Sequence, residues 1–321
     1  MKKFLCGLFA VCVLLFVSCG TDASSEDVDR PVIGVIVSDN SDSSMDMENG
    51  LIEGLQKAGY TRETTDIVCK YAGYEGYPLE DICSSMADGT YDAVVCIGAQ
   101  AAEQFIALGS ATPCFVCGVS TVYEIGLTER SDPYVTGILD CFPAEETVAL
   151  VNALTPDVDK FGLLYMANVM RSESTVNGFC QYLDSVQIDY TLMAVSGAQG
   201  VTEVADALIM DGAKAIFIPS DEGVHAELSD LVSLCCDKGV PVYCFETAAV
   251  KLGGLATVSC SDSEMGHQTA ELVSRFFTGE RIIDMPFANA NADFCAFNET
   301  TASRLGITYP ESARYKTVKY S

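Results

Sequence analysis

Short polar stretches follow several apolar runs in this sequence, and they carry the side chains best suited to binding a small molecule. Hydroxyl, amide and carboxylate groups recur in them as donors and acceptors. One guanidinium, that of Arg171, can clamp a carboxylate through two parallel hydrogen bonds, and the carboxylate of Asp221 can accept from an ammonium group. Together these two residues predict a zwitterionic ligand. The candidate ligand-binding residues are Asp39, Asn40, Gly98, Ala99, Gln100, Ser120, Thr121, Asn168, Arg171, Ser172, Asp221 and Glu246.

Each of these residues has a plainer interpretation, because a polar residue after a strand can simply cap a helix or lie in a solvated loop. The prediction of a site therefore depends on their common position. In open parallel sheets, ligands bind beyond the carboxyl ends of the strands. Short loops that open helices also present free N–H groups that attract anions such as a carboxylate.

Four tyrosines lie in the same kind of loop and could stack on a flat ligand. They are Tyr71, Tyr74, Tyr77 and Tyr123. The alternative is that they are ordinary loop tyrosines.

The sequence contains none of the common catalytic signatures. HExxH, GxSxG, GxxxxGK[ST] and GxGxxG are all absent. The only histidines, His225 and His267, fall on predicted helices, which excludes a histidine-rich metal site, and His267 is expected to be a packing residue. Carboxylates are too abundant for one pair to stand out as a glycosidase dyad. The sequence therefore predicts a protein that is not an enzyme and that uses no metal or cofactor.

The N-terminus is typical of an exported lipoprotein. Lys2 and Lys3 precede an apolar run, Phe4 to Val17, that is shorter than the roughly 18 to 20 residues needed to cross a bilayer. The run ends in Phe16-Val17-Ser18-Cys19, which resembles the lipobox whose cysteine takes the lipid. We expect a signal peptide over 1–18 and a lipidated tether over 19–30, with Cys19 as the lipid attachment site. The alternative is an ordinary cleaved signal peptide.

The fifteen cysteines do not form an obvious disulfide framework. Cys6 and Cys12 leave with the signal peptide, and most of those that remain lie in apolar runs. Cys114 and Cys117 form a CxxC motif, but residues three apart on a strand point to opposite faces. The cysteines are therefore expected to be small buried hydrophobes that stay reduced.

Charge and composition narrow the class of partner. The formal net charge is −27, which argues against nucleic acid and against anionic lipid headgroups as partners. Hydrophobic residues make up 49% of the chain, enough for packed cores, and 321 residues suggest two domains.

Strands alternate with helices from Arg30 onward, a pattern typical of parallel sheets covered on both faces. We expect helices over 201–210 and over 262–278. A first helix, capped by Ser43 or Ser44, should end at Gly59. Strands are predicted at 32–37, 66–71, 93–97, 113–117, 135–139, 161–165, 190–195, 215–218, 241–245 and 255–260.

Ten strands are too many for one compact sheet in a chain of this length. We therefore expect an α/β protein with two Rossmann-like lobes. The first crossing between them should follow Asp140, where Pro143 begins a new helix.

Several segments, in their order along the chain, resemble those of a known family. This family is the substrate-binding proteins of poorly characterised ABC importers, some of which bind tryptophan or similar amino acids. The matching segments are Asn49 to Tyr60, Thr136-Gly137-Ile138, Phe161 to Tyr165, Ile218 to Asp221, Gly239 to Val242, Gly266 to Ala270, Phe297-Asn298 and Leu305-Gly306-Ile307.

The resemblance implies the type I periplasmic-binding-protein architecture. It places 31–139 and 250–283 in lobe one and 140–249 and 284–321 in lobe two. The chain departs from the family pattern at Ser120-Thr121-Val122, at Arg171-Ser172 and at Glu222, so ligand identity does not transfer.

Together, these features predict a lipid-anchored solute-binding protein on the extracytoplasmic face of the membrane. We expect a monomer that closes its lobes on a small, amino-acid-like ligand and delivers it to an ABC permease. The alternative is a sensory lipoprotein that presents its ligand to a membrane receptor. Neighbouring permease and ATPase genes would separate the two.

Overall fold

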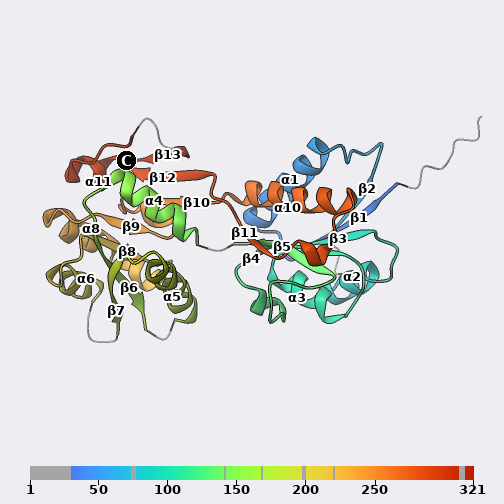
Figure 1. The fold of residues 1–321 in the computed structure, drawn as a ribbon, viewed down its shortest axis with the longest axis horizontal. Coiled ribbons are helices and arrows are strands. Elements are labelled where there is room, and N and C mark those ends of the chain that lie inside the picture. The colour runs from blue at the N-terminus through green and yellow to red at the C-terminus, as the bar shows by residue number, and fades with distance from the viewer. Residues whose placement is uncertain are drawn as a thin grey trace, which may run out of the picture. The chain divides into compact units, whose positions relative to one another are not determined.

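A computed structural model describes residues 30–73, 77–140, 142–167, 169–196, 200–219, 221–310 and 315–321. All ten predicted strands are present, in two separate sheets (Figure 1). Three short strands near the C-terminus, which the sequence did not predict, complete these sheets. The two mostly parallel sheets with alternating helices confirm the predicted α/β class.

The first sheet has the strand order β11-β5-β4-β3-β1-β2, and every neighbouring pair in it is parallel. Its strands are β1 (Val32–Val37), β2 (Asp66–Tyr71), β3 (Ala93–Ile97), β4 (Cys114–Val119), β5 (Val135–Leu139) and β11 (Ala288–Asn289).

Helices cover both faces of this sheet. Core residues of α1 (Asp42–Lys57) and α10 (Asp262–Phe277) pack on one face, and those of α2 (Leu79–Met86) and α3 (Ala99–Ala107) pack on the other. Because both faces are covered, the central strands β1 and β3 are continuous apolar runs, as the sequence suggested, whereas the edge strand β2 is only partly buried. Two 3₁₀ turns, η2 (Val122–Ile125) and η3 (Ile282–Asp284), complete the lobe.

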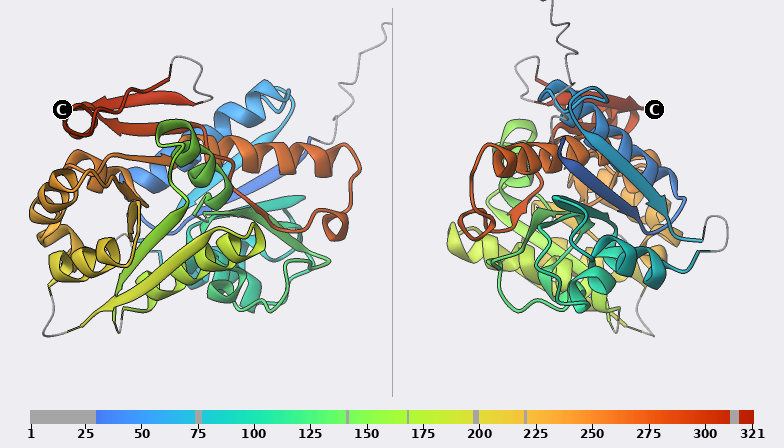
Figure 2. Two further views of the ribbon diagram at one scale, coloured as in Figure 1. Left: turned by 60° about the vertical axis from the view of Figure 1, so that its left-hand side comes forward. Right: turned by 90° about the vertical axis from the view of Figure 1, so that its right-hand side faces the viewer.

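Helices α1 and α10 pack against each other, although about 200 residues separate them in the sequence (Figures 1 and 2). Glycines make it close: a Cβ at Gly50 would lie 1.9 Å from the Ser263 carbonyl oxygen. A Cβ at Gly266 would lie 2.1 Å from the carbonyl oxygen of Met47. Any side chain at either position would force the two helix backbones apart.

The second sheet has the order β13-β12-β10-β9-β8-β6-β7, and all its pairs are parallel except the antiparallel pair of β10 and β12. Its strands are β6 (Lys160–Met166), β7 (Asp189–Val195), β8 (Ala215–Ile218), β9 (Val242–Cys244), β10 (Ala256–Ser259), β12 (Phe294–Asn298) and β13 (Lys316–Tyr320).

Within the described residues, seven helices accompany the second sheet, with α6 and α8 contributing to the core on one face and α4 and α5 to the core on the other. They are α4 (Ala144–Leu154), α5 (Met170–Ser185), α6 (Val201–Met210), α7 (Glu222–Ala226), α8 (Leu228–Asp237), α9 (Thr247–Lys251) and α11 (Glu299–Leu305).

The strand pairing of the C-terminal third differs from the lobe limits that the family resemblance implied. β10 pairs with β9 and β12 in the second sheet, although 250–283 was assigned to lobe one. β11 pairs with β5 in the first sheet, although 284–321 was assigned to lobe two. The resemblance correctly placed α10 beside the first sheet. It could not place β10 and β11, because the sheet to which a short strand belongs depends on its pairing partners. We therefore propose that the chain crosses near 140, 260 and 291.

Hydrogen bonds tie two of these crossings together. Asp293 accepts from Ser261 twice, from its backbone N–H at 2.7 Å and from its hydroxyl at 2.9 Å. The Gln268 side chain accepts from the Asn291 backbone N–H at 2.9 Å and donates to the Asn291 carbonyl at 3.1 Å. These bonds join the segments around 260 and 291 directly to each other.

Serine side chains cap the two long helices of the first lobe. Ser261 caps α10 by accepting from the Glu264 backbone N–H. The cap of α1 is Ser41 and not Ser43 or Ser44, because the helix begins at Asp42 and the Ser41 hydroxyl accepts from the Ser44 N–H.

The described cysteines are free thiols. On β4, Cys117 packs with the core under α1 and α10, whereas Cys114 packs with the core under α2 and α3. The predicted separation of the CxxC motif across the sheet is confirmed. The lipid attachment site predicted at Cys19 lies outside the described residues. Among the residues that are described, no helix is long and apolar enough to cross a membrane.

Candidate functional site

The carboxyl ends of β1, β3 and β4 lie next to one another at one edge of the first sheet, because these strands are parallel neighbours. Ser38, which directly follows β1, joins two of them: its hydroxyl donates to the Ile97 carbonyl at 2.8 Å and accepts from the Ala101 N–H at 3.0 Å. Ser38 was not among the predicted residues, although its position directly after an apolar run was a usable signal.

Asp39 lies at this edge, as predicted, and is exposed, but its carboxylate already accepts hydrogen bonds from neighbouring residues. Oδ1 accepts from the Ser41 N–H at 2.8 Å and from the Ser44 hydroxyl at 2.9 Å. Hydrogen bonds from Ser41, through its hydroxyl and its backbone N–H, lower the pKa of Asp39. The geometry thus gives Asp39 a structural role at the start of α1, and its neighbour Asn40 is exposed.

Gly98, Ala99 and Gln100 begin α3 at the same edge, with Gln100 exposed. Gly98 has φ +92°, and a Cβ there would lie 2.6 Å from the Ser38 hydroxyl oxygen. Only glycine fits this close approach without strain. The turn therefore keeps the backbone of α3 next to the end of β1.

Ser120 and Thr121 lead from β4 into η2, and both are partly buried. Within η2, Val122 and Ile125 are buried, while Tyr123 between them has 72% of its surface exposed. The Glu124 carboxylate accepts from the Ser120 N–H at 3.2 Å and closes the turn. The buried side chains of Val122 and Ile125 fix the turn, and Tyr123 points into solvent next to Ser120 and Thr121 in the sequence.

The other predicted tyrosines differ in how they are used. The Tyr71 hydroxyl donates to Glu48 on α1 at 2.7 Å, and its ring packs against the core, so it belongs to the fold. Tyr77 is 59% exposed. Tyr74 lies outside the described residues.

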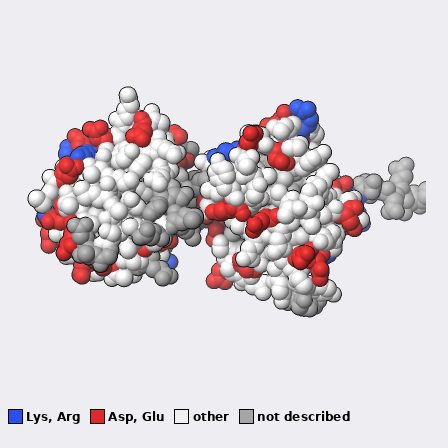
Figure 3. All heavy atoms as spheres, turned by 90° about the horizontal axis from the view of Figure 1, so that it is seen from below, with Lys and Arg blue, Asp and Glu red and all other residues white. Residues whose placement is uncertain are grey.

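The first-sheet edge also gathers carboxylates. Burial raises the pKa of Asp262, at the start of α10, and the charges of Asp140 and Asp46 raise it further against an opposing hydrogen bond from Ser43. On the face drawn in Figure 3, acidic residues are spread widely while basic ones are few, in keeping with the acidic composition.

The second sheet presents its own carboxyl edge at β6, β8 and β9. Asp221 follows β8 and caps α7 by accepting from the Gly223 N–H at 2.8 Å. Glu246 follows β9 and precedes α9, but its side chain makes no capping bond. Instead, Glu246 Oε1 lies 2.9 Å from His225 Nε2. Both carboxylates were among the predicted residues, whereas His225 was not.

The remaining predictions fall near the end of β6. Arg171 and Ser172 lie in the first turn of α5, which places their backbone at the predicted edge. Their side chains, like the whole of Asn168, lie outside what the structure describes. Their role in binding therefore stays a prediction.

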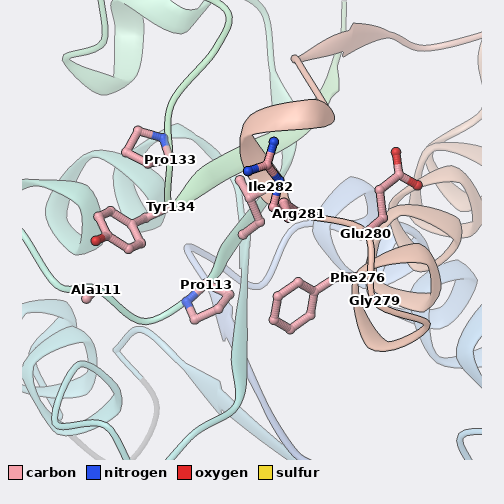
Figure 4. Close-up of a pocket in the computed structure, with 9 residues that line it drawn as sticks. All are labelled: Ala111, Pro113, Pro133, Tyr134, Phe276, Gly279, Glu280, Arg281 and Ile282. Atoms are coloured by element: carbon pink, nitrogen blue, oxygen red, sulfur yellow. The ribbon is translucent and has the colours of Figure 1, made fainter.

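A cavity of about 350 Å³ lies at the opposite, amino-terminal edge of the first sheet. Tyr134 and Pro133 line one side, with Pro113, Phe276 and Ile282 across from them (Figure 4). The charged groups at its rim are already paired, Glu280 with Arg275 and Arg281 with Asp284. It lies away from the predicted polar residues.

Sequence and structural comparisons place this architecture in context. Residues 32–319 match the family of ABC transporter substrate binding proteins. The chain is 20% identical over 276 residues to a tyrosine-binding protein of Clostridioides difficile strain R20291, covering 85% of this chain and 80% of that protein.

Two solved structures are similar over nearly the whole chain. A ligand-free, open substrate-binding protein with adhesive properties from Clostridium difficile has a TM-score of 0.76 at 21% identity, covering 91% of this chain and all of that one. A Streptococcus pneumonia ABC domain in complex with L-Trp has a TM-score of 0.54 at 25% identity, covering 90% of this chain and all of that one.

The fold, its polar strand ends and a family match over almost the entire described chain agree with one another. The chain belongs to the family of ABC transporter substrate-binding proteins.

Proposed function

We propose that the protein captures an aromatic amino acid at the carboxyl edges of its two sheets. The observation that carries this proposal is Tyr123, which two buried neighbours hold 72% exposed next to Ser120 and Thr121. An exposed aromatic ring beside hydrogen-bonding groups suits a flat, apolar side chain carried on a polar backbone. Two similar proteins support it, one named for tyrosine and one solved with L-Trp.

The charged ends of the ligand are assigned to the second lobe. Arg171 binds the carboxylate, and a carboxylate at the ends of β8 and β9 accepts from the ammonium group. Asp221 and Glu246 are the two candidates there. Losing one partner of a desolvated charge pair costs on the order of 2 to 5 kcal/mol, so Arg171→Ala should weaken binding by at least roughly 30-fold.

The proposal extends to location and partner. Substrate-binding proteins of this kind work outside the cytoplasm, and we place this one on the membrane through a lipid on Cys19, with an ABC permease as the recipient of its ligand. Changing Cys19 to Ala should release the protein from the membrane fraction or leave its precursor unprocessed. Unchanged attachment and processing would contradict the lipid anchor.

A panel of the twenty amino acids tests the ligand assignment. Ligands that bind only the folded state raise its melting temperature. We expect tyrosine, tryptophan or phenylalanine to give the largest shift, and native mass spectrometry to show a single bound molecule. A largest shift with an aliphatic or acidic amino acid, or no shift at all, would contradict the assignment.

A further inference from the structure

Two carboxylates follow neighbouring parallel strands of the second sheet, and the structure uses them differently. Asp221 accepts from the backbone N–H of Gly223 and so organises the turn that begins α7. Glu246 occupies the equivalent position before α9 but makes no capping bond with its side chain. Its Oε1 lies 2.9 Å from Nε2 of His225, an ion-pair distance without the alignment of a hydrogen bond.

The histidine is fixed more firmly than the carboxylate that it contacts. The backbone N–H of His225 donates to the Asp221 carbonyl at 2.9 Å, and its neighbour Val224 is fully buried. The His225 side chain is 18% exposed, whereas that of Glu246 is 36% exposed. A largely covered ring therefore holds a carboxylate that solvent, or a ligand, can still reach.

A carboxylate has about four acceptor positions on its two oxygens, and one contact to an imidazole leaves most of them free. That contact also restricts the rotamers of a long, flexible side chain. Restriction before binding reduces the conformational entropy that the ligand would otherwise have to offset. Asp221 also keeps free acceptor positions, but its capping bond to the Gly223 N–H directs its short side chain toward its own helix.

We propose that Glu246 is the principal acceptor for the ammonium group of the ligand and that His225 is a positioning residue that orients it. This assignment rests on the proposed binding of an amino acid. It deepens that proposal by separating the two carboxylates of the second lobe. Asp221 builds the turn that carries His225, and Glu246 contacts the ligand.

Ligands with and without the ammonium group test the assignment. L-tyrosine and L-tryptophan are compared by calorimetry with 3-(4-hydroxyphenyl)propionate and indole-3-propionate, which lack only the amino group. A hydrogen bond to a charged group contributes about 1.5 to 3 kcal/mol, so the intact protein should prefer the amino acid by roughly 10- to 150-fold. Glu246→Gln, which keeps the shape and removes the charge, should bring this ratio close to one.

The histidine is tested with two substitutions. His225→Ala should weaken amino-acid binding about three- to tenfold while leaving the desamino analogue unchanged, because an unrestrained carboxylate pays more entropy on binding. His225→Gln keeps an N–H donor near the position of Nε2 and should restore most of the affinity. A merely structural histidine would change the binding of both ligands alike.

The matched control is Glu299→Gln, which removes an exposed carboxylate paired with Lys319. It follows β12, which runs antiparallel to its neighbour β10, and so lies at the other edge of the second sheet. It should leave the ligand ratio unchanged.

The outcomes separate the two proposals. If the intact protein binds neither amino acid, the proposed function fails, and the assignment of Glu246 falls with it. If the intact protein binds and Glu246→Gln keeps the full ratio, only the assignment of Glu246 is overturned. Loss of the ratio in Asp221→Asn but not in Glu246→Gln would assign the ammonium group to Asp221 instead.

Discussion

The carboxyl edges of the two sheets have the same strand geometry but leave different groups free. At the first edge, Ser38 and Asp39 form hydrogen bonds within the protein, and the ring of Tyr123 is exposed, as are Asn40 and Gln100. At the second, Asp221 is similarly engaged, but Glu246 keeps an accessible carboxylate beside His225. We therefore propose that the first lobe recognises the apolar side chain of the ligand and the second lobe its charged groups.

The largest effect should come from separating the helices that support the first edge. Gly266→Ala places a Cβ 2.1 Å from the Met47 carbonyl oxygen, and neither helix backbone can yield cheaply. We expect a loss of about 3 kcal/mol or more in the free energy of unfolding, measured by urea denaturation.

Gly178 on α5 of the second lobe is the matched control for this change. A Cβ there meets no atom within 4 Å, so Gly178→Ala should stabilise the protein by about 0.5 to 1 kcal/mol through helix propensity. Equal losses in both variants would show that the close contact of α1 and α10 is not what matters.

The next effect concerns ligand affinity and compares two exposed tyrosines. Tyr123→Ala should weaken binding of an aromatic amino acid by roughly 5- to 150-fold, or about 1 to 3 kcal/mol, whereas Tyr123→Phe should keep most of it. Tyr134, 47% exposed at the amino-terminal cavity, serves as the control, and Tyr134→Ala should leave affinity unchanged. Calorimetry would measure the affinity of the three variants. A loss of affinity in Tyr134→Ala but not in Tyr123→Ala would place the binding site at the cavity.

A smaller effect should separate structural from ligand-binding carboxylates. Asp39→Ala should lower the free energy of unfolding by about 1 kcal/mol at pH 7 while leaving ligand affinity within about twofold, since the Asp39 carboxylate serves Ser41 and Ser44. An affinity loss of tenfold or more, with stability unchanged, would return Asp39 to the binding site.

The same variant has a pH signature. Because hydrogen bonds lower the pKa of Asp39 in the folded protein, its contribution to stability is complete above its unfolded pKa of about 3.9. It is lost as the pH falls through the folded value. The stability difference between the variant and the unmodified protein should therefore shrink below about pH 4, which denaturation at a series of pH values would measure.

The last prediction concerns how fast the buried thiols of both lobes react with an alkylating reagent. Burial raises the pKa of Cys117 and Cys235 to about 12, so little thiolate forms at pH 8. Alkylation should be slow in the folded protein and complete after unfolding without a reductant. Three or more intramolecular disulfides, detected by mass spectrometry, would contradict this expectation.

Much of the fold could be predicted because its strands are buried on both faces. Continuous apolar runs such as Val32–Val37 and Ala93–Ile97 are typical of buried strands. Their alternation with helices indicates a parallel sheet. The two-residue strand β11 and the antiparallel β12 could not be predicted, because strand order depends on pairing partners distant in sequence.

The sequence predicted that the candidate residues lie at the carboxyl edges of the sheets, but not what each side chain does there. Parallel topology brings residues after the strands to one edge, which explains why Asp39, Asp221 and Glu246 were selected together. Whether each carboxylate faces a ligand depends on local hydrogen bonds that residue type does not reveal. His225 was missed because a histidine on a helix gives no sign of a partner 21 residues away. The lack of catalytic motifs predicted a protein that is not an enzyme, and the family confirms it.

Hydrogen exchange with and without ligand tests the central claim most directly, because it reports where an aromatic amino acid binds. With saturating L-tyrosine or L-tryptophan, we predict slower exchange of the backbone amides over 120–126 and over 221–227 and 246–251, on the carboxyl edges of the two sheets. The segments that line the amino-terminal cavity, 111–113, 133–134 and 279–282, should exchange as before. Protection confined to those cavity segments, or no protection with either amino acid, would contradict the account.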